Sequence, residues 1–318
     1  MDSNSTGQDV LVVGTGVGIH TILSEIKDRL MEGVKTVLID YDAHVVARMD
    51  ADIKLVVGDY KRGLGSCPNP ECGVTFVEHS EKEIRDSTPP SRVAVIVGDA
   101  SEDFAAGGIP EIARILRDRA SLVLAVIIFP DNEKGKIIMG FADYCVVHSR
   151  DYADCIIAFR TDNIWKLGRI TLDQVYYITS NVVSSAISSI AEYLIENQDS
   201  DEAKGFFRNV SYGEMSIGES AMNGYEGAAE ALENASKGKL TDLDCASAEK
   251  IFCNVVTNEE PDGELMMKLR EFVRQLAPHS DAIVTASHLG EEGTFALILI
   301  MNAQRRPMDI RELGIDIL

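Results

Sequence analysis

The sequence predicts an α/β protein in which helices cover both faces of a parallel sheet, in a chain long enough for two domains. Short apolar runs at residues 10–13, 36–39 and 92–97 end in glycine or aspartate. Amphipathic helical patterns separate these runs, and continuous apolar strands are typical of parallel sheets that are buried on both faces. Of the 318 residues, 45% are hydrophobic, which is enough to form a substantial core.

Each element of this fold is predicted by its own pattern. In the first half we expect strands at 10–13, 36–39, 92–97, 121–128 and 155–159, and helices at 22–31 and 110–119. A helical pattern without proline or glycine runs over 172–196 and would connect two domains. In the second half we expect helices at 224–235 and 263–276, and strands at 251–256, 282–286 and 294–301.

These elements predict a two-domain organisation with a long helix between the domains. The expected segments are a flexible N-terminus (1–8), a domain of nucleotide-binding type (9–170), a central helix with an acidic loop (171–204), a smaller C-terminal α/β domain (205–305) and an acidic-hydrophobic tail (306–318).

Charge and cysteine content exclude several classes of function. The net charge of −21 disfavours nucleic acid as a main partner, because phosphate backbones would be repelled. No apolar run reaches the ~18–20 residues that a membrane span needs, and the first residues lack the features of a secretory signal. We therefore expect a cytoplasmic protein with all six cysteines reduced. A zinc site would need two close cysteine pairs, and only Cys67 and Cys72 are close.

The first glycine-rich turn is a candidate anion site. Gly14, Gly16 and Gly18 lie between a predicted strand and a predicted helix, where backbone N–H groups and the helix dipole favour phosphate. Asp40 ends the second strand, as the ribose-binding acid of a dinucleotide site would. These residues alone leave open a Rossmann-type enzyme and a plain tight turn.

Longer motifs resemble the FtsZ/tubulin superfamily. The family's N-T-D-A-Q, R-G-L-G and G-G-N-P-E-x-G motifs correspond here to residues 40–44, 62–65 and 67–73. Residues 212–235 resemble the family's glycine- and alanine-rich strand and helix, and residues 251–256 resemble its V-L-V-N-I strand. The resemblance covers residues 8–305, and its second half disfavours a dinucleotide-dependent enzyme.

The resemblance implies a GTP or GDP site and a set of binding residues. Those positions are Gly14, Gly16, Gly18, Asp40, Asp42, Asn69, Glu71, Gly98, Gly107, Gly108, Asp162, Tyr176 (or Tyr177) and Asn181. We predict no metal site, because the histidines lack metal-ligand spacing.

The resemblance also implies head-to-tail assembly with another copy or with another FtsZ subunit. Asp199 and Glu202 match the acids of the family's N-x-D-x-x-D loop, which completes the catalytic site of the next subunit. They could equally belong to a solvated acidic loop. The tail would dock a membrane-anchoring partner at the division site, or would pack as a last strand on its own domain.

The family's phosphate loop is altered in this chain. The G-G-G-T-G-T-G signature corresponds to residues 98–108, where Asp99, Glu102 and Asp103 add negative charge and Phe104 adds bulk. Thr161 replaces the asparagine that contacts guanine in the family. We therefore expect weak or absent GTP binding and hydrolysis. The alternative is an active GTPase with a remodelled loop.

Overall fold

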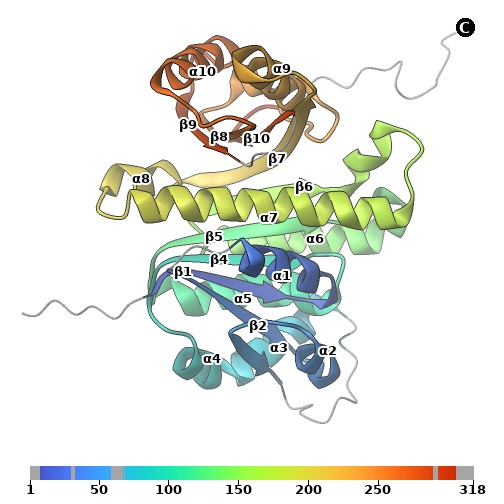
Figure 1. Cartoon of the computed structure of the whole chain (residues 1–318). Helices are drawn as coiled ribbons and strands as arrows, with labels where there is room; N and C mark the ends of the chain where they lie inside the picture. Colours follow the sequence, from blue (N-terminus) through green and yellow to red (C-terminus); the bar gives the residue numbers. More distant parts are fainter. Residues whose placement is uncertain (1–7, 30–32, 59–66, 68, 289–292, 306–318) are drawn as a thin grey trace, which may run out of the picture. The chain divides into compact units, whose positions relative to one another are not determined.

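The structure is a computed structural model that describes residues 8–29, 33–58, 67, 69–288 and 293–305. The chain divides into two compact units, Met1–Ser216 and Ile217–Leu318 (Figure 1). The long helix and acidic loop, expected as a separate segment over 171–204, group with the first unit. Residues 1–7, the motif at 62–65 and the tail at 306–318 lie outside the described residues. The predicted α/β class is confirmed.

The first unit is built on a parallel sheet with strand order β3-β2-β1-β4-β5-β6-β7. Its strands are β1 (Gln8–Thr15), β2 (Val34–Asp40), β3 (Ile53–Val56), β4 (Ser91–Asp99), β5 (Ala120–Phe129), β6 (Cys155–Arg160) and β7 (Val210–Ser220), the last of which continues into the second unit. Because the strands are parallel, their carboxyl ends form one edge of the sheet, which we call the carboxyl edge.

Helices cover both faces of this sheet. They are α1 (His20–Asp28), α2 (Ala43–Arg48), α3 (Pro70–His79), α4 (Glu81–Ser87), α5 (Asp103–Arg117), α6 (Lys136–Ser149), α7 (Leu172–Glu196) and α8 (Asp201–Phe206), with short 3-10 turns η1 (Val17–Ile19), η2 (Asn132–Lys134) and η3 (Thr161–Leu167). Leu11 and Val13 belong to the core that α3, α5 and α6 cover. Val12, on the opposite face, lies beside Ile26 of α1 and Ile187 of α7.

Helix α7 spans the first unit from one edge of the sheet to the other (Figure 1). Thr171 and Gln174 form a capping box at its start, next to η3 at the carboxyl edge. Its 25 residues extend about 37 Å at 1.5 Å per residue. Just beyond its end, Gln198 accepts a hydrogen bond from Arg92, which lies at the start of β4 (3.1 Å). The two ends of α7 therefore mark opposite edges of the sheet.

The second unit is a smaller α/β structure. Strand β8 (Lys250–Thr257) pairs in parallel with β9 (Asp281–His288) and antiparallel with β10 (Thr294–Met301). The end of β7, α9 (Gly224–Lys237), η4 (Cys245–Ser247) and α10 (Gly263–Leu276) complete it. Both helices and all three strands that follow β7 were expected from the sequence.

Helix α5 departs from the prediction. We expected it to begin at Pro110, since proline is favoured in the first turn of a helix, but it begins at Asp103 and contains Pro110. Nearly all of its residues from Phe104 to Leu116 are buried. Burial of this long apolar face outweighs the cost of an interior proline.

Helices α3 and α5 cross at very short range. A Cβ atom on Gly107 would lie 1.8 Å from the Pro70 carbonyl oxygen, and one on Gly73 would lie 2.3 Å from the Phe104 carbonyl oxygen. Atoms in contact are normally well over 3 Å apart, so both positions require glycine. This crossing fixes the start of α5 relative to the start of α3.

We predict that Gly107→Ala will destabilise the protein by about 2–3 kcal/mol, because the new methyl group would force the helices apart. The matched control is Gly140→Ala in α6, where a Cβ would meet nothing within 4 Å. That change should be neutral or stabilising by up to about 1 kcal/mol. Urea denaturation of both variants measures the difference, and equal stabilities would contradict the assigned crossing.

Candidate functional site

The turn after β1 has the geometry of an anion-binding turn. Gly16 has φ of +96°, a conformation that glycine adopts at little cost. The chain then passes through η1 into α1, so N–H groups at the start of the helical region face outward. The sequence predicted this turn at Gly14, Gly16 and Gly18. Of these, Gly14 serves packing, because a Cβ there would meet Ile19.

A carboxylate of the chain itself occupies the turn. The Gly18 N–H donates to Oε1 of Glu102 at 3.2 Å, and Oε2 of Glu102 lies 2.7 Å from where a Cβ of Gly16 would be. Glu102 is the N-cap residue of α5, and its own N–H donates to the Asp99 carbonyl (3.0 Å). The short loop from Asp99 to Glu102 therefore places a negative charge against the glycine turn.

Two hydrogen bonds hold Ser101, in the middle of this loop. The Ser101 N–H donates to Oδ1 of Asp99 at 2.8 Å, and Lys134 of η2 donates to the Ser101 hydroxyl at 2.9 Å. Oδ2 of Asp99 lies 3.9 Å from the Cβ position of Gly18. Carboxylates of Asp99 and Glu102 thus approach the same point beside the turn.

Aromatic side chains fill the space next to the loop. The ring centroid of Tyr41 lies 5.2 Å from that of Phe104 and 5.8 Å from that of Phe76. The centroids of Phe76 and Phe104 are 6.5 Å apart. Tyr41 follows β2, Phe76 belongs to α3 and Phe104 begins α5, so this aromatic cluster joins three elements beside the carboxyl edge.

Asp40 is buried at the end of β2, as the strand pattern predicted. Its Oδ1 accepts from the Asp42 N–H at 2.8 Å, and its Oδ2 has no hydrogen-bond partner among the described residues. Burial raises the pKa of Asp40 to about 6, and the backbone amides of Asp42, Gly16 and Tyr41 oppose this rise. The pKa of the Tyr41 hydroxyl is raised by burial and by the charges of Asp40, Asp42, Glu102 and Asp103.

Two of the motif residues have clear structural roles. Asp42 caps α2 by accepting from the His44 N–H (2.8 Å) and the Val45 N–H (3.4 Å). Asn69 caps α3 by accepting from the Cys72 N–H at 3.2 Å. Glu71, in the first turn of α3, is exposed. Their assignment to nucleotide binding stays a prediction, because capping alone accounts for Asp42 and Asn69.

The stretch 98–108, which we aligned with the family's glycine loop, is irregular only as far as Glu102, so the expectation of a loop over all of it is not met, while the assignment of its glycines to a nucleotide site stays a prediction. The loop ends at Glu102, and Gly107 and Gly108 lie buried within α5. Gly107 permits the crossing with α3, while a Cβ on Gly98 would clash with Ile109 and Thr15. These glycines serve helix and strand packing, a role that sequence alone could not separate from a ligand loop.

The residues expected on the base side of the site are spread along η3 and α7. Asp162 forms an ion pair with Arg160 at 3.0 Å, with both side chains 9% exposed. Tyr176 and Tyr177 are exposed in the second turn of α7, and Asn181 donates to the Tyr177 carbonyl (3.1 Å). All of these residues lie toward the carboxyl-edge end of the unit.

The acidic loop lies at the opposite end of the unit. Asp199 and Glu202 are exposed between the end of α7 and the first turn of α8, where the Ser200 hydroxyl caps α8. The bond between Gln198 and Arg92 places this loop at the amino edge of the sheet. Within one chain, Asp199 and Glu202 are therefore separated from the glycine turn by the length of α7.

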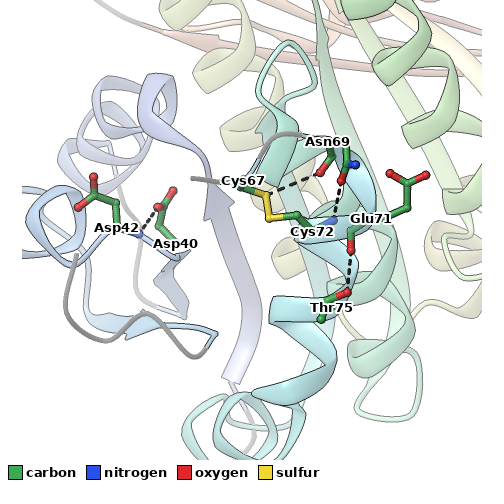
Figure 2. The surroundings of a disulfide bond; sticks show 7 residues. All are labelled: Asp40, Asp42, Cys67, Asn69, Glu71, Cys72 and Thr75. Carbon is green, nitrogen blue, oxygen red and sulfur yellow. Dashed lines mark hydrogen bonds between the residues drawn. A yellow bond between two sulfur atoms is a disulfide. The ribbon is translucent and has the colours of Figure 1, made fainter. Parts of the chain in front are cut away.

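Cys67 and Cys72 form a disulfide, so the expectation of six reduced cysteines is wrong (Figure 2). The bond closes a short ring around Asn69 and Glu71 at the start of α3, and Thr75 in the next turn donates to the Glu71 carbonyl (2.9 Å). Cys145, Cys155, Cys245 and Cys253 are free and buried. The spacing of Cys67 and Cys72 across a helix cap was the signal that could have revealed the pair.

The described residues contain neither a candidate metal centre nor a candidate membrane-spanning helix. No group of three or more His, Cys, Asp or Glu side chains is arranged to hold a metal ion in that part of the chain. Among the same residues, every helix is too short or too polar to cross a bilayer.

Comparison with known proteins identifies a matching family and several similar proteins. The model of the Tubulin/FtsZ family GTPase domain matches residues 12–169. The chain is 24% identical to cell division protein FtsZ 1 of Methanocaldococcus jannaschii over 98% of this chain and 87% of that protein. It is 26% identical to FtsZ of Buchnera aphidicola, over 88% of this chain and 74% of that protein.

Solved structures of FtsZ and CetZ proteins have the same fold as this chain. An empty FtsZ dimer from M. jannaschii superimposes with a TM-score of 0.84 at 24% identity, covering 94% of this chain and 89% of that one. A GTPγS-bound protofilament of CetZ2 from Haloferax volcanii gives 0.75 at 16% identity, covering 93% and 95%. The chain belongs to the FtsZ/tubulin superfamily.

The raised pKa of Asp40 predicts a pH-dependent cost to stability. Between its ordinary pKa of 3.8 and the folded value of about 6, the folded state holds a proton that the unfolded state has lost. The stability of the wild type should therefore fall as pH rises through this window. Asp40→Asn should be the more stable protein above pH 7, by about 2–3 kcal/mol at most.

Denaturation of both proteins at pH 5 and pH 8 measures this effect. The advantage of Asp40→Asn should grow with pH. A constant difference between the two proteins would show that Asp40 is not protonated on folding.

We predict that the disulfide stabilises the first unit. Closing a ring of this size restricts the unfolded chain, by about 2 kcal/mol in the chain-entropy account. Reduction with dithiothreitol should lower the free energy of unfolding by that order. The Cys67→Ser/Cys72→Ser variant should start at the lower value and should not respond to the reductant. If dithiothreitol also destabilised the double variant, the stabilisation would not come from the Cys67–Cys72 disulfide.

Proposed function

We propose that the protein is an FtsZ-like cytoskeletal subunit that works through head-to-tail protein contacts in the cytoplasm and binds and hydrolyses GTP weakly or not at all. The observation that supports it most directly is Glu102 in the glycine turn. Its carboxylate accepts the Gly18 N–H, which is a donor that a phosphate would need. A triphosphate would have to displace this carboxylate and then lie beside Asp99, another carboxylate.

The aromatic cluster supports the same proposal. Phe104 is 2% exposed and packs against Tyr41 and Phe76 at the point where the family's loop brings backbone close to phosphate. The loop before α5 has no glycine between Asp99 and Phe104. The residues at the carboxyl edge therefore fit a triphosphate poorly.

The separation of the acidic loop from the glycine turn supports assembly. Exposed acids at one end of the first unit and the turn at the other cannot meet within a single chain. They could meet only between subunits stacked along the same direction. The CetZ2 protofilament and the FtsZ dimer are assembled forms of related proteins. A membrane-anchor partner at the tail remains a prediction from the family resemblance.

We expect the purified protein to carry no stoichiometric nucleotide. The measurement is denaturation followed by anion-exchange chromatography of the supernatant, with sedimentation velocity before and after addition of GTP. Association should change little with GTP, since the turn is already occupied by Glu102. An FtsZ that retains the glycine loop serves as control.

Bound GDP or GTP in stoichiometric amount would favour an active GTPase with a remodelled loop. GTP-dependent assembly would favour it as well. Either result would overturn the proposal.

A further inference from the structure

Five exposed hydrophobic side chains lie in the segment where η3 leads into α7. We call them the aromatic patch: Trp165, Leu167, Leu172, Tyr176 and Tyr177. They are half of the large hydrophobic side chains that are exposed in the described part of the chain. Leu172 and Tyr176 are four positions apart in α7 and therefore share one face of it. Apolar side chains gathered in this way on a surface are typical of an interaction site.

The aromatic patch also contains the positive charge of this part of the surface. Lys166 and Arg169 lie within the sequence of the patch, and both are exposed. No acid lies between Asp162 and Asp173 in the sequence. Asp162 belongs to the ion pair with Arg160, and Asp173 is exposed in the first turn of α7. A chain with a net charge of −21 therefore presents a basic, aromatic surface at the start of α7.

The far end of α7 carries the opposite charge. Its last residue, Glu196, and three acids that follow it, Asp199, Asp201 and Glu202, are all exposed. Lys204 pairs with Asp201 at 3.5 Å, so an excess of negative charge remains. Helix α8 lies at this end of α7, and residues 161–171 lead into the other end (Figure 1). One helix of about 37 Å thus joins a basic, aromatic surface to an acidic one.

We propose that the aromatic patch receives the acidic segment 196–202 of a second copy of this chain, stacked in the same direction along α7. The inference rests on the function proposed above and names the surface that the contact uses. Because the two surfaces lie at the two ends of one helix, a shift along that helix by roughly its length brings the segment of one copy to the patch of the next. Such a head-to-tail contact repeats from copy to copy and forms a filament.

The glycine turn lies at the same edge of the sheet but does not suit the acidic segment. Glu102 already accepts the Gly18 N–H, and Asp99 approaches the same point. Carboxylates of an incoming copy would be repelled there, whereas Lys166 and Arg169 would attract them. The acidic segment therefore docks on the aromatic patch and does not enter the turn.

Apolar contact and charge have different roles in this interface. Exposed ion pairs contribute little to affinity, whereas tryptophan and tyrosine are enriched among the residues that dominate binding. Ile195 and Phe206, which flank the acidic segment, are half-buried and offer apolar surface to Tyr176 and Tyr177. We expect the aromatic side chains to supply most of the affinity. Opposite charges then fix the direction of stacking and make association sensitive to salt.

Sedimentation velocity of the full-length protein over a range of concentrations tests the apolar part of the contact. Tyr176→Ser/Tyr177→Ser should weaken self-association by about tenfold or more. The matched control is Ile137→Ser/Val147→Ser, which removes two exposed apolar side chains from α6 and should leave association unchanged. Equal weakening by both pairs would overturn the inference.

A charge exchange tests which surfaces meet. Lys166→Glu/Arg169→Glu and Asp199→Arg/Glu202→Arg should each weaken self-association, because like charges then face each other. In a 1:1 mixture of these two variants association should return, since the patch of each variant then meets an opposite charge on the other. The control Glu259→Arg/Glu260→Arg adds the same charge at exposed positions of the second unit and should not restore association with the Lys166→Glu/Arg169→Glu variant.

The outcomes separate this inference from the function proposed above. A mixture that stays dissociated, or a wild type that remains monomeric at every concentration, would overturn this inference alone. Loss of bound guanine nucleotide in the tyrosine variant, with association unchanged, would also overturn it, because the patch would then serve a base. Stoichiometric GTP in the wild type as purified would overturn the proposed function, whatever the mixture does.

Discussion

The crossing of α3 and α5 positions the loop and the aromatic side chains that lie beside the glycine turn. Gly73 and Gly107 bring the two helices together closely enough that the first turn of α5 has little freedom. Glu102 caps that turn and Phe104 belongs to it, and Asp99 holds the loop before it by accepting the Glu102 N–H at its carbonyl. The disulfide between Cys67 and Cys72 lies at the start of α3, the other helix of this crossing. Packing between these helices therefore holds the Glu102 carboxylate against Gly18.

The acidic side chains of the first unit differ in burial, and burial sets how strongly each is desolvated. The net charge of −21 could be spread evenly over the surface, yet acids gather at the carboxyl edge and again at the far end of α7. Asp40 is buried at the end of β2, and its raised pKa reflects the desolvation of its carboxylate. The exposed Asp199 and Glu202 are solvated instead. The same residue types thus differ in energy according to the edge they occupy.

Regular elements were predictable because they depend on local patterns. Continuous apolar runs located five of the seven strands of the first unit's sheet (β1, β2, β4, β5 and β6) but not β3 or β7, and the uninterrupted helical pattern gave the bounds of α7. Individual candidate residues were named from motifs or from their place at the end of a strand, as Asp40 was. Their contacts were not predictable, because the distance from Glu102 to Gly18 depends on how α5 packs against α3, across more than 80 positions of sequence. The start of α5 was missed for the same reason: Pro110 obeys a local rule, and burial of the helix overrides it.

The side chains beside the glycine turn depend on one another through packing, so that no single substitution would open the turn to a phosphate. Removing the Glu102 carboxylate would free the Gly18 N–H, but Phe104 would still fill the adjacent space against Tyr41 and Phe76. Replacing Phe104 with a small residue would open a cavity among three elements and weaken the packing that positions the loop. Under the proposed function, a phosphate site at this edge would therefore require several substitutions together, each of which would cost stability when made alone. Coupled packing of this kind is consistent with the proposal that the edge acts through protein contacts, because no single substitution would both free the Gly18 N–H and clear the space that Phe104 fills.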